Sequence, residues 1–389
     1  MPLVPAYIVA ARRTALGRIG GLHRNRRIDS LTAPVIEAVL ADAGVAPDQV
    51  DELILGNATE GGNPARLVSL AAGLPECVSA LSIDRQCASG LDAILAAIRS
   101  VGVGGAELVV AGGGDSLSTA PWRVARPRNP YQMPHFVHVE ASSDAEGGGE
   151  RQPFAASEAL ARRLGITRAA QDAWAFAAHQ RAAAAQEARA FVGEIVALRA
   201  NAEEMRDQSA TAPDVEELSE SVPYLAGDGT LTPTNTSSMH DGAAFVIVAS
   251  EAAWRGLGSP PALRLVASVA VGVAPHEEAI APITATRKLL GRNGALNMAD
   301  IGVIEMSEAS AAQALAFADA FHLDASRINP QGGAVVRGHP LGAAGAVLVT
   351  RLFTALARGG TTEPRAKLGL ATLGALGGIG VAAAFERAQ

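Results

Sequence analysis

Apolar side chains recur at helical spacing in two segments that lie far apart in the chain. The first segment follows a strand-like apolar run, and its apolar residues fall at i, i+3, i+4 and i+7: Leu91, Ile94, Leu95 and Ile98. The second segment also follows a strand-like run and continues through four apolar residues: Val347, Leu348, Leu352 and Leu356. Positions three and four apart share one face of a helix, so each segment predicts a strand followed by an amphipathic helix.

The sequence before each of these helices repeats the same arrangement. Residues 40–44 and 289–294 each predict a helix that ends near glycine, and each is followed by an acidic residue and a buried-looking strand. Asp51 precedes Cys87 by 36 residues, and Asp300 precedes His339 by 39. We therefore expect two copies of one α/β unit, related by a pseudo-twofold axis that brings both helix starts to a shared cleft.

A different kind of sequence, from Thr119 to Ser238, separates the two halves. It predicts two helices, one opened by Ser157 and Glu158 and one over Arg168–Arg189 with Thr167 as its N-cap. We expect an N-terminal half over 1–118, to which 239–265 returns, an inserted loop domain over 119–238, and a C-terminal half over 266–389. Strands that alternate with helices predict mixed sheets that are covered on both faces.

Composition excludes several classes of function. The chain of 389 residues is 49% hydrophobic, but it contains no apolar run long enough to cross a bilayer, so we expect no membrane partner. A net charge of −7 gives no electrostatic footprint for nucleic acid. Two cysteines argue against a disulfide scaffold. With no evident secretory signal, they favour a cytoplasmic location.

A cysteine and a histidine occupy the two predicted helix starts. Cys87 lies in residues 82–90, and His339 lies in residues 332–345. A helix start presents unpaired N–H groups and a positive dipole end, so we expect the pKa of Cys87 to lie below ~8.5. A buried, inert cysteine is the alternative that the local sequence leaves open. Cysteine paired with histidine favours covalent acyl transfer.

These motifs, taken together, resemble those of the thiolase family. The matching segments follow the family's order nearly end to end: residues 8–17, 63–66, 82–90, 235–244, 338–340 and 369–373. The combination is highly specific, although no single motif would be. The resemblance implies a thiolase fold of two pseudo-symmetric α/β halves with mixed sheets, layered α-β-α-β-α, with an inserted loop domain that covers the cleft and binds coenzyme A.

The resemblance also implies roles for individual residues. Cys87 matches the nucleophile that accepts the acyl group, and His339 matches the histidine that activates it and helps to form an oxyanion site. Ser237 falls where the family places a serine against pantetheine, and the turn near Leu376 and Gly377 presents backbone amides. We therefore expect an acyltransferase that uses CoA thioesters without a permanently bound cofactor or metal, as a homodimer or homotetramer.

Two positions depart from the family's pattern. Ser307, followed by Glu308, stands where thiolases carry an asparagine that holds a catalytic water; its hydroxyl could hold a water with a shorter reach. Gly374 stands where they carry a second cysteine, which moves the proton in carbon–carbon bond chemistry. Loss of a general acid–base group costs roughly 10²- to 10⁴-fold in rate but would leave acylation of Cys87 largely intact.

These departures leave two alternatives for the function. One is an acyltransferase in which the acceptor or Ser307 takes up and returns protons. The other is a non-catalytic or weakly catalytic subunit that binds acyl-CoA or scaffolds a complex. The family's basic residue for phosphate appears as Val222, and a solvated basic loop is the favoured interpretation of the nearby arginines, Arg123, Arg126 and Arg128. The glycines at 374–380 are too near the chain's end for a dinucleotide-binding unit.

Overall fold

The computed structural model describes residues 4–127, 129, 131–136, 154–198, 202–212, 215–292, 296–359 and 367–388. Five strands build the sheet of the N-terminal half. In sheet order these are β4 (Ser79–Ile83), β3 (Glu52–Gly56), β5 (Leu108–Asp115), β7 (His240–Ser250) and β1 (Ala6–Thr14). Two short strands pair beside this path, β2 (Gly17–Arg18) with β7 and β6 (Ile195–Val196) with β1.

The C-terminal half repeats this arrangement with four strands. In sheet order these are β8 (Leu263–Gly272), β11 (Ile379–Arg387), β10 (Leu368–Ala375) and β9 (Ile301–Ser307). β9 runs parallel to β10 as β3 runs parallel to β5, and β4 of the N-terminal half also runs parallel to β3. The other neighbours within each half are antiparallel. The predicted pseudo-symmetry is thus confirmed. The halves also join, because β1 and β8 pair at Tyr7–Arg264 and Ile8–Leu263.

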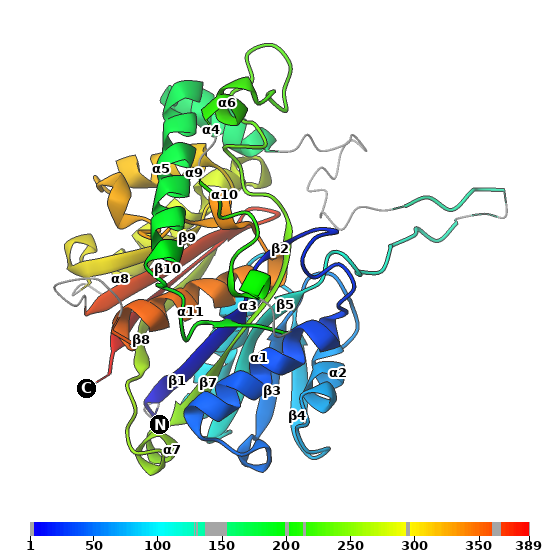
Figure 1. The fold of residues 1–389 in the computed structure, drawn as a ribbon, viewed down its shortest axis with the longest axis vertical. Coiled ribbons are helices and arrows are strands. Elements are labelled where there is room, and N and C mark those ends of the chain that lie inside the picture. Colours follow the sequence, from blue (N-terminus) through cyan, green and yellow to red (C-terminus); the bar gives the residue numbers. More distant parts are fainter. Residues whose placement is uncertain are drawn as a thin grey trace.

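Helices fill the space between the halves and cover both outer faces (Figure 1). The central pair is α3 (Ser89–Gly102) and α11 (Ala344–Leu356), which pack against each other. The N-terminal half is covered by α1 (Ile28–Ala43) and α2 (Pro64–Ala71), and the C-terminal half by α8 (Ala281–Arg292) and α9 (Ala311–Ala320). Separate apolar cores lie between these layers. The five-layered α-β-α-β-α fold is as predicted.

The inserted segment adds helices above the central pair. These are α4 (Ala155–Leu164), α5 (Arg168–Glu187) and α6 (Val215–Glu220). The side chain of Thr167 accepts a hydrogen bond from the N–H of Ala170, which confirms it as the N-cap of α5. The helix ends at Glu187, short of the predicted Arg189, whose φ of +54° is not helical. α4 begins at Ala155, ahead of the predicted start at Ser157.

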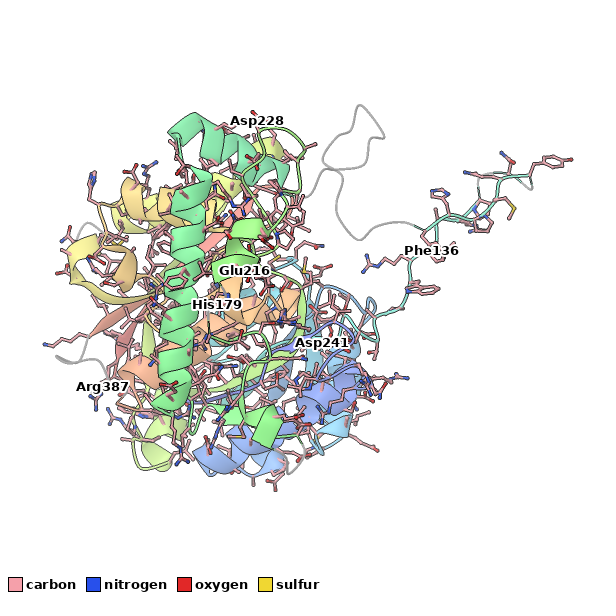
Figure 2. The ribbon with its side chains drawn as sticks, turned by 45° about the horizontal axis from the view of Figure 1, so that its top comes forward. Phe136, His179, Glu216, Asp228, Asp241 and Arg387 are labelled. Carbon is pink, nitrogen blue, oxygen red and sulfur yellow. The ribbon has the colours of Figure 1, made fainter. Side chains whose placement is uncertain are left out.

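The remaining helices are short and lie in connections. They are α7 (Glu251–Gly256), α10 (Ala334–Arg337) and the 3-10 turns η1 (Pro47–Gln49), η2 (Ala202–Met205), η3 (Pro275–Ile280), η4 (Met298–Asp300), η5 (Ala325–Arg327) and η6 (Leu341–Ala343). Residues 121–127, 129 and 131–136 lie on an arm that projects from the body and carries Phe136 (Figure 2). On this arm Trp122 packs edge-on against Phe136, and both rings are exposed.

A buried ionic cluster ties the inserted segment to both halves. Arg13 of β1 is fully buried and pairs with Glu194 at 2.7 Å and with Asp207 at 2.6 Å. Arg351 of α11 pairs with Glu194, and Arg337 of α10 lies 3.4 Å from Asp207. Removal of one partner from such a buried pair leaves an uncompensated charge and typically costs about 3–5 kcal/mol. The cluster therefore fixes α10, which leads directly to His339.

Candidate active site

Cys87 lies in a tight turn between β4 and α3. Gln86, immediately before it, has a φ of +52°, a left-handed conformation that is strained for a residue with a side chain. The hydroxyl of Ser89 holds this turn, because it accepts from the N–H of Arg85 at 2.8 Å and donates to the carbonyl of Gln86 at 2.6 Å. The turn presents Cys87 two residues before α3 begins, as the sequence predicts.

The predicted lowering of the Cys87 pKa was wrong. Burial raises the pKa of the Cys87 thiol to about 12, because a thiolate would lose most of its hydration there. The backbone N–H groups of Leu376 and of Cys87 itself are hydrogen-bonded to the sulfur and lower its pKa, but they offset only part of this effect. The helix start lowers the pKa of Cys87 only locally. Desolvation by the surrounding layers raises it, and this effect is larger.

His339 lies between α10 and η6 and is fixed through its backbone. Its N–H donates to the carbonyl of Ser238 at 2.8 Å, and its carbonyl accepts from the N–H of His240 at 3.0 Å. Ser307 Oγ lies 3.0 Å from Nδ1 of the ring. Burial, and secondly the neighbouring His240, lowers the pKa of His339 to about 4. The imidazole is therefore neutral at pH 7, as is the Cys87 thiol.

Two glycines allow the two helix starts to approach each other. A Cβ on Gly90 would lie 2.5 Å from the carbonyl oxygen of Gly342, and a Cβ on Gly345 would lie 2.6 Å from Cβ of Leu91. Any side chain at either position would push α3 and α11 apart. Asp115 at the end of β5 completes the junction, because its carboxylate accepts from the N–H of Gly342 at 2.6 Å. It thereby joins the end of β5 to the η6 turn that follows His339.

Cys87 and His339 line one cavity of about 470 Å³ at the junction of the halves and the inserted segment. Of the other residues predicted for the site, Ser307, Ser237 and Leu376 also line it. Gly377 is not among the lining residues, but its N–H donates to Oε2 of Glu278, which lines the cavity, at 3.3 Å. The rest of the lining is Phe154, Ser157, Tyr224, Ser238, Met239, Glu278, Ala279, Ala309, Gln313, Gly374 and Ala375.

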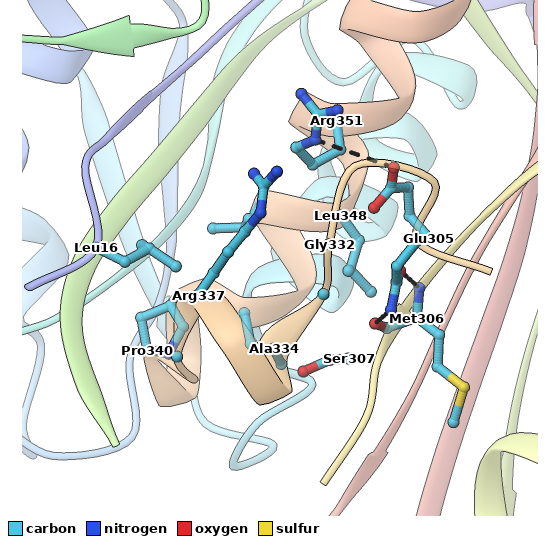
Figure 3. Close-up of a pocket in the computed structure, with 15 residues that line it drawn as sticks. Leu16, Glu305, Met306, Ser307, Gly332, Ala334, Arg337, Pro340, Leu348 and Arg351 are labelled. Atoms are coloured by element: carbon cyan, nitrogen blue, oxygen red, sulfur yellow. Dashed lines mark hydrogen bonds and ion pairs between the residues drawn. The ribbon is translucent and has the colours of Figure 1, made fainter. Parts of the chain in front are cut away.

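Ser307 also borders a second, much smaller cavity of about 30 Å³, whose lining residues Figure 3 shows. This cavity is lined by charged side chains of the ionic cluster, Arg337 and Arg351, and by Glu305. Burial raises the pKa of Glu305 to about 7, although Arg351 and Arg337 oppose the shift. Ser307 thus separates the main cavity from a buried charged region, and its hydroxyl contacts His339 directly.

Sequence reasoning missed several residues that build the site. Phe154 and Tyr224 stack at 5.2 Å and line the cavity from the inserted segment. Glu278 contributes a carboxylate from η3, a turn that carries no recognisable motif. Glu308, in contrast, belongs to the motif that begins at Ser307. It is fully buried and accepts from Asn329 at 2.7 Å and from the N–H of Ala334 at 2.9 Å, so it orients the loop before α10.

Among the described residues, those considered for phosphate binding do not line the cavity. Neither Arg123 nor Arg126 lines the cavity, and Arg128 lies outside the described residues. Val222 is 77% exposed. In the part of the chain that the structure describes, no group of three histidine, cysteine or acidic residues could hold a metal ion. No helix among the described residues is long and apolar enough to span a bilayer.

Comparison with known proteins decides the family. The N-terminal domain of thiolases matches residues 6–252, and their C-terminal domain matches residues 259–387. The chain belongs to the thiolase family. An acetyl-CoA acetyltransferase of Allochromatium vinosum is 38% identical and one of Pseudomonas aeruginosa is 37% identical, each over 98% of both chains. The crystal structure of the Bacillus anthracis acetyl-CoA acetyltransferase superposes with a TM-score of 0.90 at 32% identity, covering all of both chains.

The thiolase relatives bear out the fold and the family that the motifs predict. The roles of Cys87, His339, Ser307, Ser237, Leu376 and Gly377 stay predictions, because the comparisons are made over whole chains rather than at single residues.

Proposed function

We propose that this thiolase transfers acyl groups between CoA thioesters through a covalent acyl-enzyme on Cys87. As a member of the family, the chain is an acyltransferase that acts on acyl-CoA. The proposal for the site is carried by one observation: Cys87 and His339 line one cavity, and the backbone N–H of Leu376 contacts the sulfur. A nucleophile, a base and an oxyanion donor are the parts that acyl transfer requires.

The neutral states of Cys87 and His339 determine how the first step, acylation of Cys87, begins. Because the pKa of Cys87 is raised to about 12 and that of His339 is lowered to about 4, a thiolate–imidazolium pair is disfavoured in the free enzyme. We infer that the thiol proton passes to His339 as Sγ attacks the thioester carbonyl. Since Ser307 occupies Nδ1, Nε2 is the nitrogen that receives the proton. His339 then returns it to the departing CoA sulfur.

The backbone amides of Leu376 and Cys87 would stabilise the oxyanion that forms during this attack. We place the pantetheine arm of CoA along Ser237, whose hydroxyl and N–H both contact the carbonyl of Ala309 at the cavity wall. Phe154 and Tyr224 supply an apolar surface at the same opening. Acetyl-CoA is the substrate named for the curated relatives, and we propose it as the first to test.

Isotope exchange tests this function without requiring carbon–carbon chemistry. An acyl-enzyme that forms reversibly exchanges labelled CoA into acetyl-CoA with no second substrate. We expect this exchange in the native protein and its loss in Cys87→Ser, with Cys77→Ser as the control because Cys77 is the other free cysteine and is exposed. A protein that binds acetyl-CoA without any exchange would instead be the non-catalytic subunit that the missing second cysteine leaves open.

We also propose that the protein is a homodimer or homotetramer in the cytoplasm. Within the described chain β4 is the edge strand of the sheet, and apolar side chains near this edge are exposed: Leu67, Leu70 and Leu81. Unpaired strand edges invite association. Light scattering should show an oligomer. Leu81→Lys should weaken it, whereas Val103→Lys, at an exposed position after α3, should not. A monomer at micromolar concentration would overturn this proposal. Two free cysteines suit a reducing compartment.

A further inference from the structure

Carbon–carbon bond formation in this cavity needs a group that removes a proton from the second thioester. Gly374, where thiolases carry their second cysteine, lies on the cavity wall and offers no side chain. A Cβ built there would lie 3.4 Å from Pro282 and 3.6 Å from the side chain of Gln313, at ordinary contact distance. Gly374 therefore leaves space in the wall of the cavity that Cys87 also lines.

Glu278 supplies a carboxylate to the same cavity. It projects from η3, and its Oε2 accepts from the N–H of Gly377 in the turn between β10 and β11. The backbone on both sides of Glu278 is held as well: Val273 N–H donates to the carbonyl of Gly378 at 2.7 Å, and the carbonyl of Ala279 accepts from Gln313 at 3.0 Å. The turn that positions Glu278 also contributes Leu376, whose N–H contacts Cys87.

The composition of the cavity lining makes Glu278 the candidate for proton transfer. Among the described residues that line it, Glu278 is the one carboxylate. It lies close enough for its charge to raise the pKa of Cys87, after the larger effects of burial. Carboxylates serve elsewhere as bases that remove a proton next to a carbonyl.

We propose that Glu278 is the acid–base group for carbon–carbon chemistry in this enzyme; this proposal rests on the acyl-enzyme function above. In condensation, the Glu278 carboxylate takes the Cα proton of the second acetyl-CoA. The freed electron pair forms a bond to the acyl carbon on Cys87, and the C–S bond breaks with its electrons on Sγ. The proton held by Glu278 then passes to Sγ, which restores both groups. Cleavage of the 3-ketoacyl thioester runs these steps in reverse.

Deuterium exchange tests the proposal directly. In D₂O the native enzyme should exchange the α-protons of acetyl-CoA, and Glu278→Gln should slow this exchange and acetoacetyl-CoA cleavage by ~10²-fold or more. Acetyl-CoA/CoA exchange should fall far less. Glu277→Gln is the matched control, because Glu277 lies on the same turn but pairs with Arg163 and does not line the cavity.

Further variants separate proton transfer from a structural role. Glu278→Asp should keep part of the α-proton exchange, and addition of Gly374→Cys to Glu278→Gln should restore part of the cleavage rate. Undiminished α-proton exchange in Glu278→Gln would overturn the proposal, as would an equal loss of α-proton and CoA exchange. Absence of CoA exchange in the native protein would instead contradict the acyl-enzyme function itself.

Discussion

The hydroxyl of Ser307 lies 3.0 Å from Nδ1 of His339, and both residues are buried. Ser307 ends β9, and its neighbour in register on β10 is Leu373, one residue before Gly374. We expect this hydrogen bond to fix the orientation of the imidazole and to leave Nε2 for the proposed proton transfer from Cys87. The resemblance to thiolases implies an asparagine at this position, whereas Ser307 contacts the histidine directly.

Removal of this contact should slow acylation. Ser307→Ala loses one neutral hydrogen bond, worth about 0.5–1.5 kcal/mol, and we expect the single-turnover rate of Cys87 acylation to fall by about 2- to 10-fold. Ser310→Ala is the control: Ser310 caps α9 by accepting from the N–H of Gln313, so its loss should cost about 1 kcal/mol of stability but leave acylation unchanged. Equal acylation rates in Ser307→Ala and the native protein would contradict a positioning role.

Cys87 should remain a neutral thiol well above pH 7. Because burial raises its pKa to about 12, its thiolate fraction grows tenfold per pH unit through the accessible range. Alkylation of Cys87 by iodoacetamide, followed by peptide mass spectrometry, should therefore rise through pH 10 without levelling off. Exposed Cys77 reports on the reagent in the same sample. A plateau below pH 9 would show that the helix start outweighs burial after all.

Acid should destabilise the protein through His339. Its pKa is lowered from 6.5 to about 4 by burial, so between these values the unfolded chain binds more protons than the folded chain. The free energy of unfolding should fall as pH drops through this window, and His339 should account for about 3 kcal/mol of the loss. Urea midpoints from pH 7 to pH 4 should decline less steeply in His339→Asn. Parallel slopes in the two proteins would contradict the assignment.

A cysteine at position 374 should increase carbon–carbon chemistry. Gly374 has space for a side chain, and its φ is not in the left-handed region, unlike that of Gly377. We expect Gly374→Cys to raise acetoacetyl-CoA turnover by ~10-fold, since general acid–base catalysis contributes at least that. Gly374→Ala fills the same space without a thiol and should give no gain. No gain in Gly374→Cys while acylation is intact would contradict this prediction.

Sequence patterns predicted the two repeated α/β halves because each strand and helix leaves its own pattern in a short stretch of the chain. The spacing from Asp51 to Cys87 and from Asp300 to His339 marks β3 and β9, which occupy matching places in the two halves. The N-cap at Thr167 is equally local, since its partner lies three residues away. The pairing of β1 with β8 could not be predicted from local sequence patterns, because the two strands are distant in sequence.

The same distinction explains which parts of the site could be predicted. Cys87 and His339 lie in recognisable motifs, and both line the cavity. Glu278 reaches that cavity from a turn whose sequence carries no motif, so only the folded chain reveals it. The raised pKa of Cys87 depends on burial by elements from both halves, and a dipole argument that considers one helix gives the opposite sign.

Intact-mass spectrometry after incubation with acetyl-CoA tests the acyl-enzyme most directly. The protein should gain one acetyl group, peptide mapping should place it on Cys87, and free CoA should remove it. Cys87→Ser should gain none, while Cys77→Ser should behave as the native protein. An unchanged mass with acetyl-CoA and with every longer acyl-CoA tested, or an acetyl group that persists in Cys87→Ser, would contradict catalysis through Cys87.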